Sequence, residues 1–180
     1  MYAILRIVSI IIFLVLAFLI FVGLVAEPQT QISCTEIINS PTTIVWQILT
    51  DTEKMPDWYD QVLRVELENK GPIDKNSVLI LYYSRSRERN FNKVRVEDFI
   101  SEKQLSLKKI DIGSKALLKD YTREFKLKSL LDGTTEVTHQ ISYRPTTFFS
   151  RIFNKLVLEK ETGKQCSEIL HKLKQVLEKV

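Results

Sequence analysis

Hydrophobic and polar residues follow three different patterns along the 180-residue chain. The first is an apolar stretch at residues 7–26, IVSIIIFLVLAFLIFVGLVA, which contains no charged side chain. A helix of that length measures roughly 30 Å, the hydrocarbon thickness of a bilayer, so the stretch predicts a transmembrane helix. A cleaved signal peptide is the alternative. Its apolar core would be shorter, and with Ala26 at the last position before cleavage, Leu24 would occupy a position that favours a small residue.

The charges around this stretch predict its orientation. Arg6 precedes it, whereas Glu27 follows it and the next basic residue is Lys54. Positive charge collects on the cytoplasmic side of membrane proteins, so the N-terminus is expected in the cytoplasm and the remainder outside. The sequence therefore predicts a single-pass protein of the cell membrane, with residues 1–26 as anchor and residues 27–180 as one extracytoplasmic domain.

The second pattern is the alternation of apolar and polar residues that is typical of strands. Two segments interrupt it early: residues 41–50, a helix that begins with a proline, and residues 51–60, a short second helix or a tight turn. Asp132-Gly133 predicts a hairpin turn between the last two strands. Strand character is found in seven segments: 30–38, 61–68, 78–86, 91–100, 105–112, 121–128 and 137–143.

The third pattern is a three- and four-residue spacing of apolar residues over 148–179, which predicts one long helix with a single apolar face. The element order is thus strand, two short helices, six strands and a long helix. We expect an α+β fold in which a curved antiparallel sheet of about seven strands wraps around the C-terminal helix, preceded by the transmembrane helix.

Composition and charge restrict the partners. The chain carries 26 basic and 22 acidic residues, and these interleave along the sequence, so no nucleic-acid partner is expected. The two cysteines, Cys34 and Cys166, lack the spacing of a metal site, and no metal is predicted. They either form a disulfide in an oxidising compartment or remain two small buried side chains.

The opening of the domain resembles a known family. It combines a proline-started helix containing a Val-Trp pair, a Thr-Asp end and a Pro-x-Trp segment, in this chain Pro41, Val45-Trp46, Thr50-Asp51 and Pro56-Asp57-Trp58. This resembles the polyketide cyclase/dehydrase branch of the START/SRPBCC superfamily, and the likeness covers about residues 30–178. The resemblance implies the helix-grip fold. Members of the superfamily bind lipids, sterols, quinones or polyketides, cyclise polyketides, or bind proteins.

A curved sheet closed by one helix leaves an apolar cavity, the usual form of a small-molecule site. Polar residues on the expected concave face are candidates for contacting the head group of a ligand; Arg123, for example, would pair with an anionic or carbonyl oxygen. The alternatives are that His139 is hydrogen-bonded within the core, that Arg123 extends past the sheet edge, and that Gly163 only accommodates packing. We predict ligand contacts from six residues: Tyr82, Tyr121, Arg123, His139, Tyr143 and Gly163.

The sequence favours binding over catalysis. It has two histidines, His139 and His171, and it lacks GxSxG, GxGxxG and Walker A patterns, so no catalytic residue and no cofactor is predicted. The leading hypothesis is a membrane-anchored module that holds a lipid or another hydrophobic molecule. An enzyme resembling the polyketide cyclases, or a protein-interaction module with a vestigial cavity, is the alternative.

A basic cluster lies around the third hairpin. It consists of Arg85, Arg87, Arg89, Lys93 and Arg95. It either contacts anionic lipid head groups or forms a solvated hairpin tip.

Overall fold

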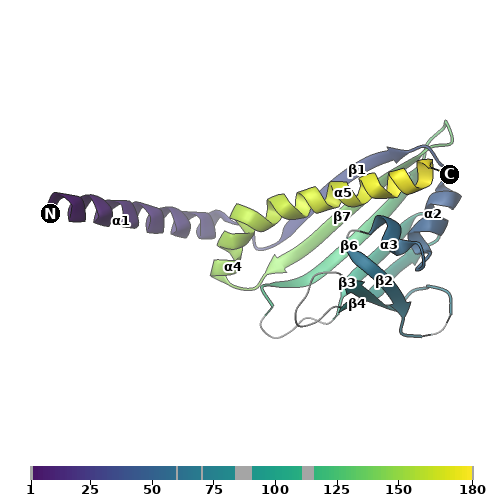
Figure 1. Cartoon of the computed structure of the whole chain (residues 1–180), viewed down its shortest axis with the longest axis horizontal. Helices are drawn as coiled ribbons and strands as arrows, with labels where there is room; N and C mark the ends of the chain where they lie inside the picture. The colour runs from purple at the N-terminus through teal and green to yellow at the C-terminus, as the bar shows by residue number, and fades with distance from the viewer. Residues whose placement is uncertain (1, 60, 70, 84–90, 111–115, 180) are drawn as a thin grey trace.

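The computed structural model describes residues 2–59, 61–69, 71–83, 91–110 and 116–179. Seven strands form one antiparallel sheet in the order β1-β7-β6-β5-β4-β3-β2 (Figure 1). The strands are β1 (Thr30–Ile38), β2 (Val62–Leu67), β3 (Val78–Tyr83), β4 (Phe91–Ile100), β5 (Gln104–Lys109), β6 (Leu118–Ser129) and β7 (Thr135–Pro145). The helices are α1 (Tyr2–Val25), α2 (Thr42–Thr50), α3 (Met55–Trp58), α4 (Phe148–Phe153), η1 (Asn154–Leu158) and α5 (Glu159–Glu178). The predicted helix-grip order is confirmed.

The longest strand pair, β6 and β7, organises the concave face. Phe125 pairs with His139 and Leu127 with Val137, so alternate side chains of both strands share one face. The predicted Asp-Gly turn joins the two strands: Gly133 has a φ of +79°, and Asp132 Oδ1 accepts a hydrogen bond from Thr134 N at 3.0 Å. The turn fixes the register that aligns these faces.

Helix α5 packs along one side of the sheet instead of over its middle. It lies against β1 and β7 (Figure 1). Cys34 of β1 and Cys166 of α5 form a disulfide, with their Cα atoms 6.2 Å apart. Of the two alternatives for the cysteines, the structure has the bonded one. On the neighbouring part of the concave face, Trp58 of α3 packs edge-on against Phe125 of β6, with ring centres 5.6 Å apart.

The predicted continuous helix over residues 148–179 is correct except for one segment. Residues Asn154–Leu158 form a π-helical turn between α4 and α5. The buried Asn154 side chain donates from Nδ2 to Thr30 Oγ1 at 2.8 Å, which ties this wider turn to the start of β1. Thr147 caps α4 by accepting a hydrogen bond from Ser150 N at 3.1 Å.

Helix α1 extends away from the domain (Figure 1). Residues Ile4–Val25 have a mean hydropathy of 3.3 and are almost entirely exposed, so α1 is long and apolar enough to cross a membrane; a signal sequence would share these properties. Only its last turn is buried, at Val22, Gly23 and the following Ala26. A Cβ atom at Gly23 would lie 2.3 Å from Phe148 Cζ, so the glycine permits a close approach of α1 to α4.

Candidate functional site

A cavity of about 450 Å³ lies on the concave face over β3 to β6, away from α5. Its walls mix aliphatic side chains with tyrosine, arginine and lysine. The lining residues are Tyr59, Tyr83, Asn92, Val94, Leu107, Lys109, Ala116, Leu117, Leu118, Tyr121 and Arg123. Its size and its apolar walls with a few polar groups are typical of small-molecule sites.

Arg123 forms the polar end of this cavity. Its guanidinium lies between two aromatic rings, with Cζ 5.1 Å from the ring centre of Tyr59 and 5.6 Å from that of Tyr121. Nη2 donates a hydrogen bond to the Tyr121 hydroxyl at 3.0 Å. Nη1 is shielded from solvent and has no partner among the described residues. The rings therefore hold the guanidinium in place where Arg123 lines the cavity.

The charge at this end is positive. Burial acts to lower the pKa of Arg123, but neighbouring tyrosine hydroxyls, Tyr59 foremost, outweigh it, and the guanidinium stays a cation. Burial raises the pKa of Tyr59, so its phenol stays protonated and can donate a hydrogen bond. Lys109 is a second cationic residue in the lining, and no carboxylate lines the cavity within the described ranges. The cavity therefore favours an anionic or carbonyl oxygen over a cation.

The structure brings Tyr121 and Arg123 together in this cavity but not Tyr82. The hydroxyl of Tyr82 donates to Glu66 Oε2 at 2.7 Å, and its ring lies under Arg64. The neighbouring Tyr83 lines the cavity instead. The difference between Tyr82 and Tyr83 follows from the alternation along β3, since adjacent side chains lie on opposite faces of a strand.

His139 and Tyr143 lie on the expected face of the sheet, but under α5 and outside the cavity lining. His139 is fully buried and stacks on Phe125 with ring centres 4.4 Å apart; its Nδ1 donates to Cys166 O at 3.4 Å. Burial is the main reason that the pKa of His139 falls to about 3, with Arg123 as a second cause, so the imidazole is neutral. Tyr143 stacks on Tyr121 with ring centres 5.8 Å apart and thereby connects the two regions.

Gly163 is also outside the cavity. It lies on α5, and a Cβ atom built there would have no neighbour within 4 Å. Neither a close strand approach nor the cavity therefore requires a glycine at this position. The histidines likewise do not line the cavity: His171 Nε2 lies 2.9 Å from the Gln175 amide on the exposed side of α5.

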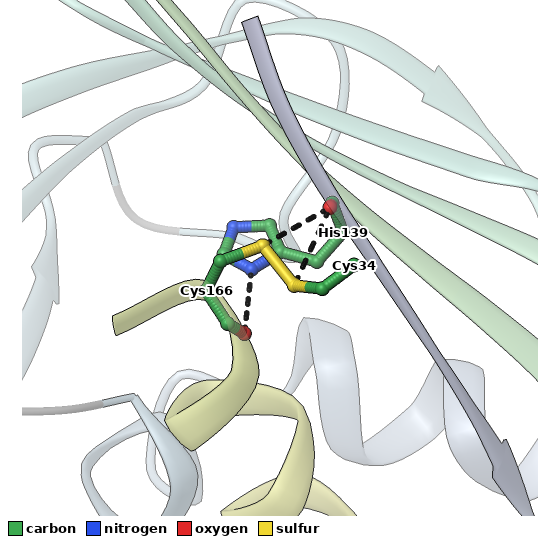
Figure 2. A group of neighbouring side chains, drawn as sticks. All are labelled: Cys34, His139 and Cys166. Carbon is green, nitrogen blue, oxygen red and sulfur yellow. Dashed lines mark hydrogen bonds between the residues drawn. A yellow bond between two sulfur atoms is a disulfide. The ribbon is translucent and has the colours of Figure 1, made fainter. Parts of the chain in front are cut away.

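Cys34, His139 and Cys166 form a cluster whose ligand atoms lie within 4.8 Å of one another (Figure 2). This composition would suit a metal ion if the thiols were free. In the structure the two sulfurs are bonded to each other and cannot serve as thiolates. Both sulfurs approach the main-chain oxygen of His139, at 3.8 and 3.3 Å; these are contacts without a proton between them. The cluster is therefore a covalent crosslink packed against a neutral histidine.

Of the predicted basic cluster, Arg85, Arg87 and Arg89 lie outside the described residues. Lys93 forms an ion pair with Glu68 at 2.6 Å, and Arg95 is exposed on β4. The described part therefore combines one ion pair with one exposed arginine.

Besides Tyr83, sequence reasoning missed three polar residues of the cavity: Tyr59, Asn92 and Lys109. Tyr59 follows the Pro-x-Trp segment and is almost completely buried, which its position beside Trp58 could have indicated. Asn92 and Lys109 lie near strand ends, where alternation gives a weak prediction.

Residues 29–178 match the family described as polyketide cyclase / dehydrase and lipid transport. The chain belongs to this family. No curated protein sequence matches this family member.

Solved structures agree on the fold of this cyclase/dehydrase family member. Norcoclaurine synthase from Thalictrum flavum, in complex with dopamine and hydroxybenzaldehyde, superposes with a TM-score of 0.65 at 12% identity, covering 88% of this chain and 91% of the synthase. The Zhui aromatase/cyclase from Streptomyces sp. R1128 gives 0.62 at 14% identity, over 82% and 94% of the two chains. The Aha1 dimer from Colwellia psychrerythraea gives 0.58 at 13% identity, over 82% and 96%. At these identities the likeness concerns the fold alone.

Proposed function

We propose that this family member is a membrane-anchored binding module that holds a hydrophobic molecule with an anionic or carbonyl head group in the cavity over β3 to β6. The observation that carries the proposal is Arg123: a cation held against two tyrosine rings in a cavity of about 450 Å³ whose lining combines aliphatic and polar side chains. A buried charged donor is stabilised when an oxygen accepts its hydrogen bond.

The position of α1 supports an anchor. Its last turn is buried against the domain, with Gly23 in close contact with Phe148. Cleavage after Ala26 would remove that contact. The Cys34–Cys166 disulfide supports a location outside the cytoplasm, because disulfides persist in oxidising compartments. An anchored domain would keep its cavity close to a supply of membrane lipids.

The cavity residues favour binding over chemistry. Neither histidine lines the cavity, and no carboxylate does so in the described part of the chain. Histidine is the residue most often used in general acid–base catalysis, but lysine and tyrosine also serve, so an enzymatic alternative would rest on Lys109 and the lining tyrosines. The tyrosines and Arg123 are well suited to orient an oxygen atom.

Native mass spectrometry of the detergent-purified full chain tests the proposal, because micelles are removed in the gas phase while ligands in a cavity are retained. Two variants serve as matched controls that keep the anchor: Val94→Trp fills the cavity, and Ala116→Trp obstructs it without altering the buried core. We expect a lipid-sized adduct on the wild type and a loss of that adduct in both variants. A wild type that carries no adduct after addition of a total lipid extract, or equal adducts on all three proteins, would contradict the proposal.

A further inference from the structure

The α4–η1 surface exposes large apolar side chains to an unusual degree. Phe149 is 80% exposed, and Phe148, Phe153, Leu156 and Val157 are each 39–49% exposed. The uncharged polar residues of the same segment, Ser150 and Asn154, are buried. An exposed apolar stripe on an otherwise well-packed domain is typical of a contact surface.

This apolar stripe lies next to the C-terminal part of α1. Leu16, Leu19 and Ile20 of α1 and the apolar residues of α4 and η1 line one groove of about 420 Å³. Ile20 and Leu16 precede the end of α1 by roughly 8 and 14 Å along the helix axis, at about 1.5 Å per residue. If α1 spans a bilayer, the groove lies at the depth of the acyl chains. This depth is similar to the roughly 5–10 Å to which an amphipathic helix buries its apolar face in a membrane interface.

The polar flank of this segment suits the head-group region. Arg151 lies in α4, and Lys155 and Lys160 follow it. Lys155 also pairs with Glu159 at 2.9 Å, so the flank is only weakly basic. Long basic side chains beside a phenylalanine-rich face are characteristic of helices that lie in a membrane interface.

The same end of the molecule carries the rim of the cavity. Thr146, two residues before α4, donates from its main-chain N to Leu117 O at 3.0 Å and from Oγ1 to Ala116 O at 3.0 Å. Ala116 and Leu117 line the cavity, and the Leu117 side chain is 56% exposed. The rim is therefore hydrogen-bonded to the segment that leads into the apolar stripe.

We infer that α4 and η1 insert their apolar stripe among the acyl chains of the bilayer, which brings the Ala116–Leu118 rim to the membrane interface for direct exchange of a hydrophobic molecule. This inference rests on the proposed anchor and cavity. The occupant of the groove is bilayer lipid, because α1, which would lie in the same hydrocarbon layer, forms its other wall.

Tryptophan quenching in the full chain tests the insertion. The native Trp46 and Trp58 are buried in the domain, so they provide a constant background. Three variants each add one tryptophan: Phe149→Trp in the stripe, Phe13→Trp in α1, and Leu131→Trp at the hairpin tip distant from α1. Each is reconstituted in nanodiscs of dioleoyl phosphatidylcholine and of its brominated analogue, whose bromine atoms lie on the acyl chains.

We expect the added emission of Phe149→Trp and Phe13→Trp to be lost largely in the brominated lipid, and that of Leu131→Trp to be unchanged. Quenching at residue 13 without quenching at residue 149 would overturn the insertion while leaving the anchor intact. Absence of quenching at both positions would overturn the anchor and the insertion together. Phe149→Tyr, which adds no tryptophan and keeps an aromatic ring, should show the wild-type background in both lipids.

Discussion

Cys34 and Cys166 join the edge strand β1 to helix α5 across 132 positions of sequence. The bond lies beside the neutral His139 and fixes α5 over β1 and β7. The opposite side of the concave face thereby remains available for the cavity, whose walls come from β3 to β6. The location of the cavity thus follows from the position of one helix.

Loss of this bond should destabilise the fold. A crosslink over a long loop restricts the unfolded chain, and removal of a native disulfide typically costs about 2–5 kcal/mol. The Cys34→Ala/Cys166→Ala variant in detergent should therefore show a clearly lower melting temperature than the wild type. A reducing agent should lower the melting temperature of the wild type and leave that of the variant unchanged. Equal melting temperatures for the oxidised wild type and the variant would contradict the expected role.

His139 should make stability depend on pH. The unfolded histidine takes up a proton below about pH 6.5, whereas the native imidazole stays neutral down to about pH 3 because it is buried. Its contribution is therefore fully present above pH 6.5 and declines as pH falls, by up to about 1.4 kcal/mol per pH unit. Denaturant titrations between pH 7 and pH 4 would measure this decline.

His139→Phe is the matched variant, because a phenyl ring keeps the stacking on Phe125 and cannot titrate. The free energy of unfolding of the wild type should fall more steeply with decreasing pH than that of the variant. If the free energy of unfolding changed with pH to the same extent in both proteins, His139 would not be the cause of the loss of stability at low pH.

Arg123 should discriminate ligands by charge. Anilinonaphthalene sulfonate carries an anionic group that N-phenylnaphthylamine lacks, while the aromatic part is the same. Arg123→Met should weaken binding of the anionic probe about 10- to 100-fold, the value of one charge-assisted hydrogen bond, and affect the neutral probe little. Fluorescence titrations in matched nanodiscs, with empty discs subtracted, measure both. An equal loss for both probes would assign Arg123 a structural role.

The adjacent tyrosines of β3 should differ in effect. Tyr83 lines the cavity, whereas Tyr82 is bonded to Glu66 on the other face of the sheet. Tyr83→Ala should therefore alter the affinity for N-phenylnaphthylamine, and Tyr82→Ala should leave it at the wild-type value. An affinity that changed in Tyr82→Ala but not in Tyr83→Ala would mean that Tyr82, and not Tyr83, faces the cavity.

The sequence was sufficient to predict the order of elements and the shared face of β6 and β7, because these strands are long and alternate regularly. It also placed Tyr121 and Arg123 on one face, although the pairing of β6 with β7 shifts between Lys119 and Thr122. It did not resolve Tyr82 from Tyr83, since β3 has only six residues and its register also depends on a shift between Val62 and Arg64 on β2. Local alternation cannot encode such a shift.

The separation of His139 and Tyr143 from the cavity was equally inaccessible to sequence periodicity. Alternation assigns a face to each residue, but it does not specify which part of that face a helix covers. The cover over His139 depends on where α5 lies, which involves a disulfide between distant residues and the contact of Asn154 with Thr30. These are long-range features of the packed chain.

If α1 anchors the domain as proposed, the crosslink has a mechanical consequence. β1 is an edge strand and the first element after α1, so a lateral pull transmitted by α1 would act to unzip β1 from β7. Cys34 lies midway along β1, and unzipping that starts at Thr30 meets a covalent bond after four residues. The load then passes into α5, whose broad contact with the sheet resists shear far better than a peeling edge does.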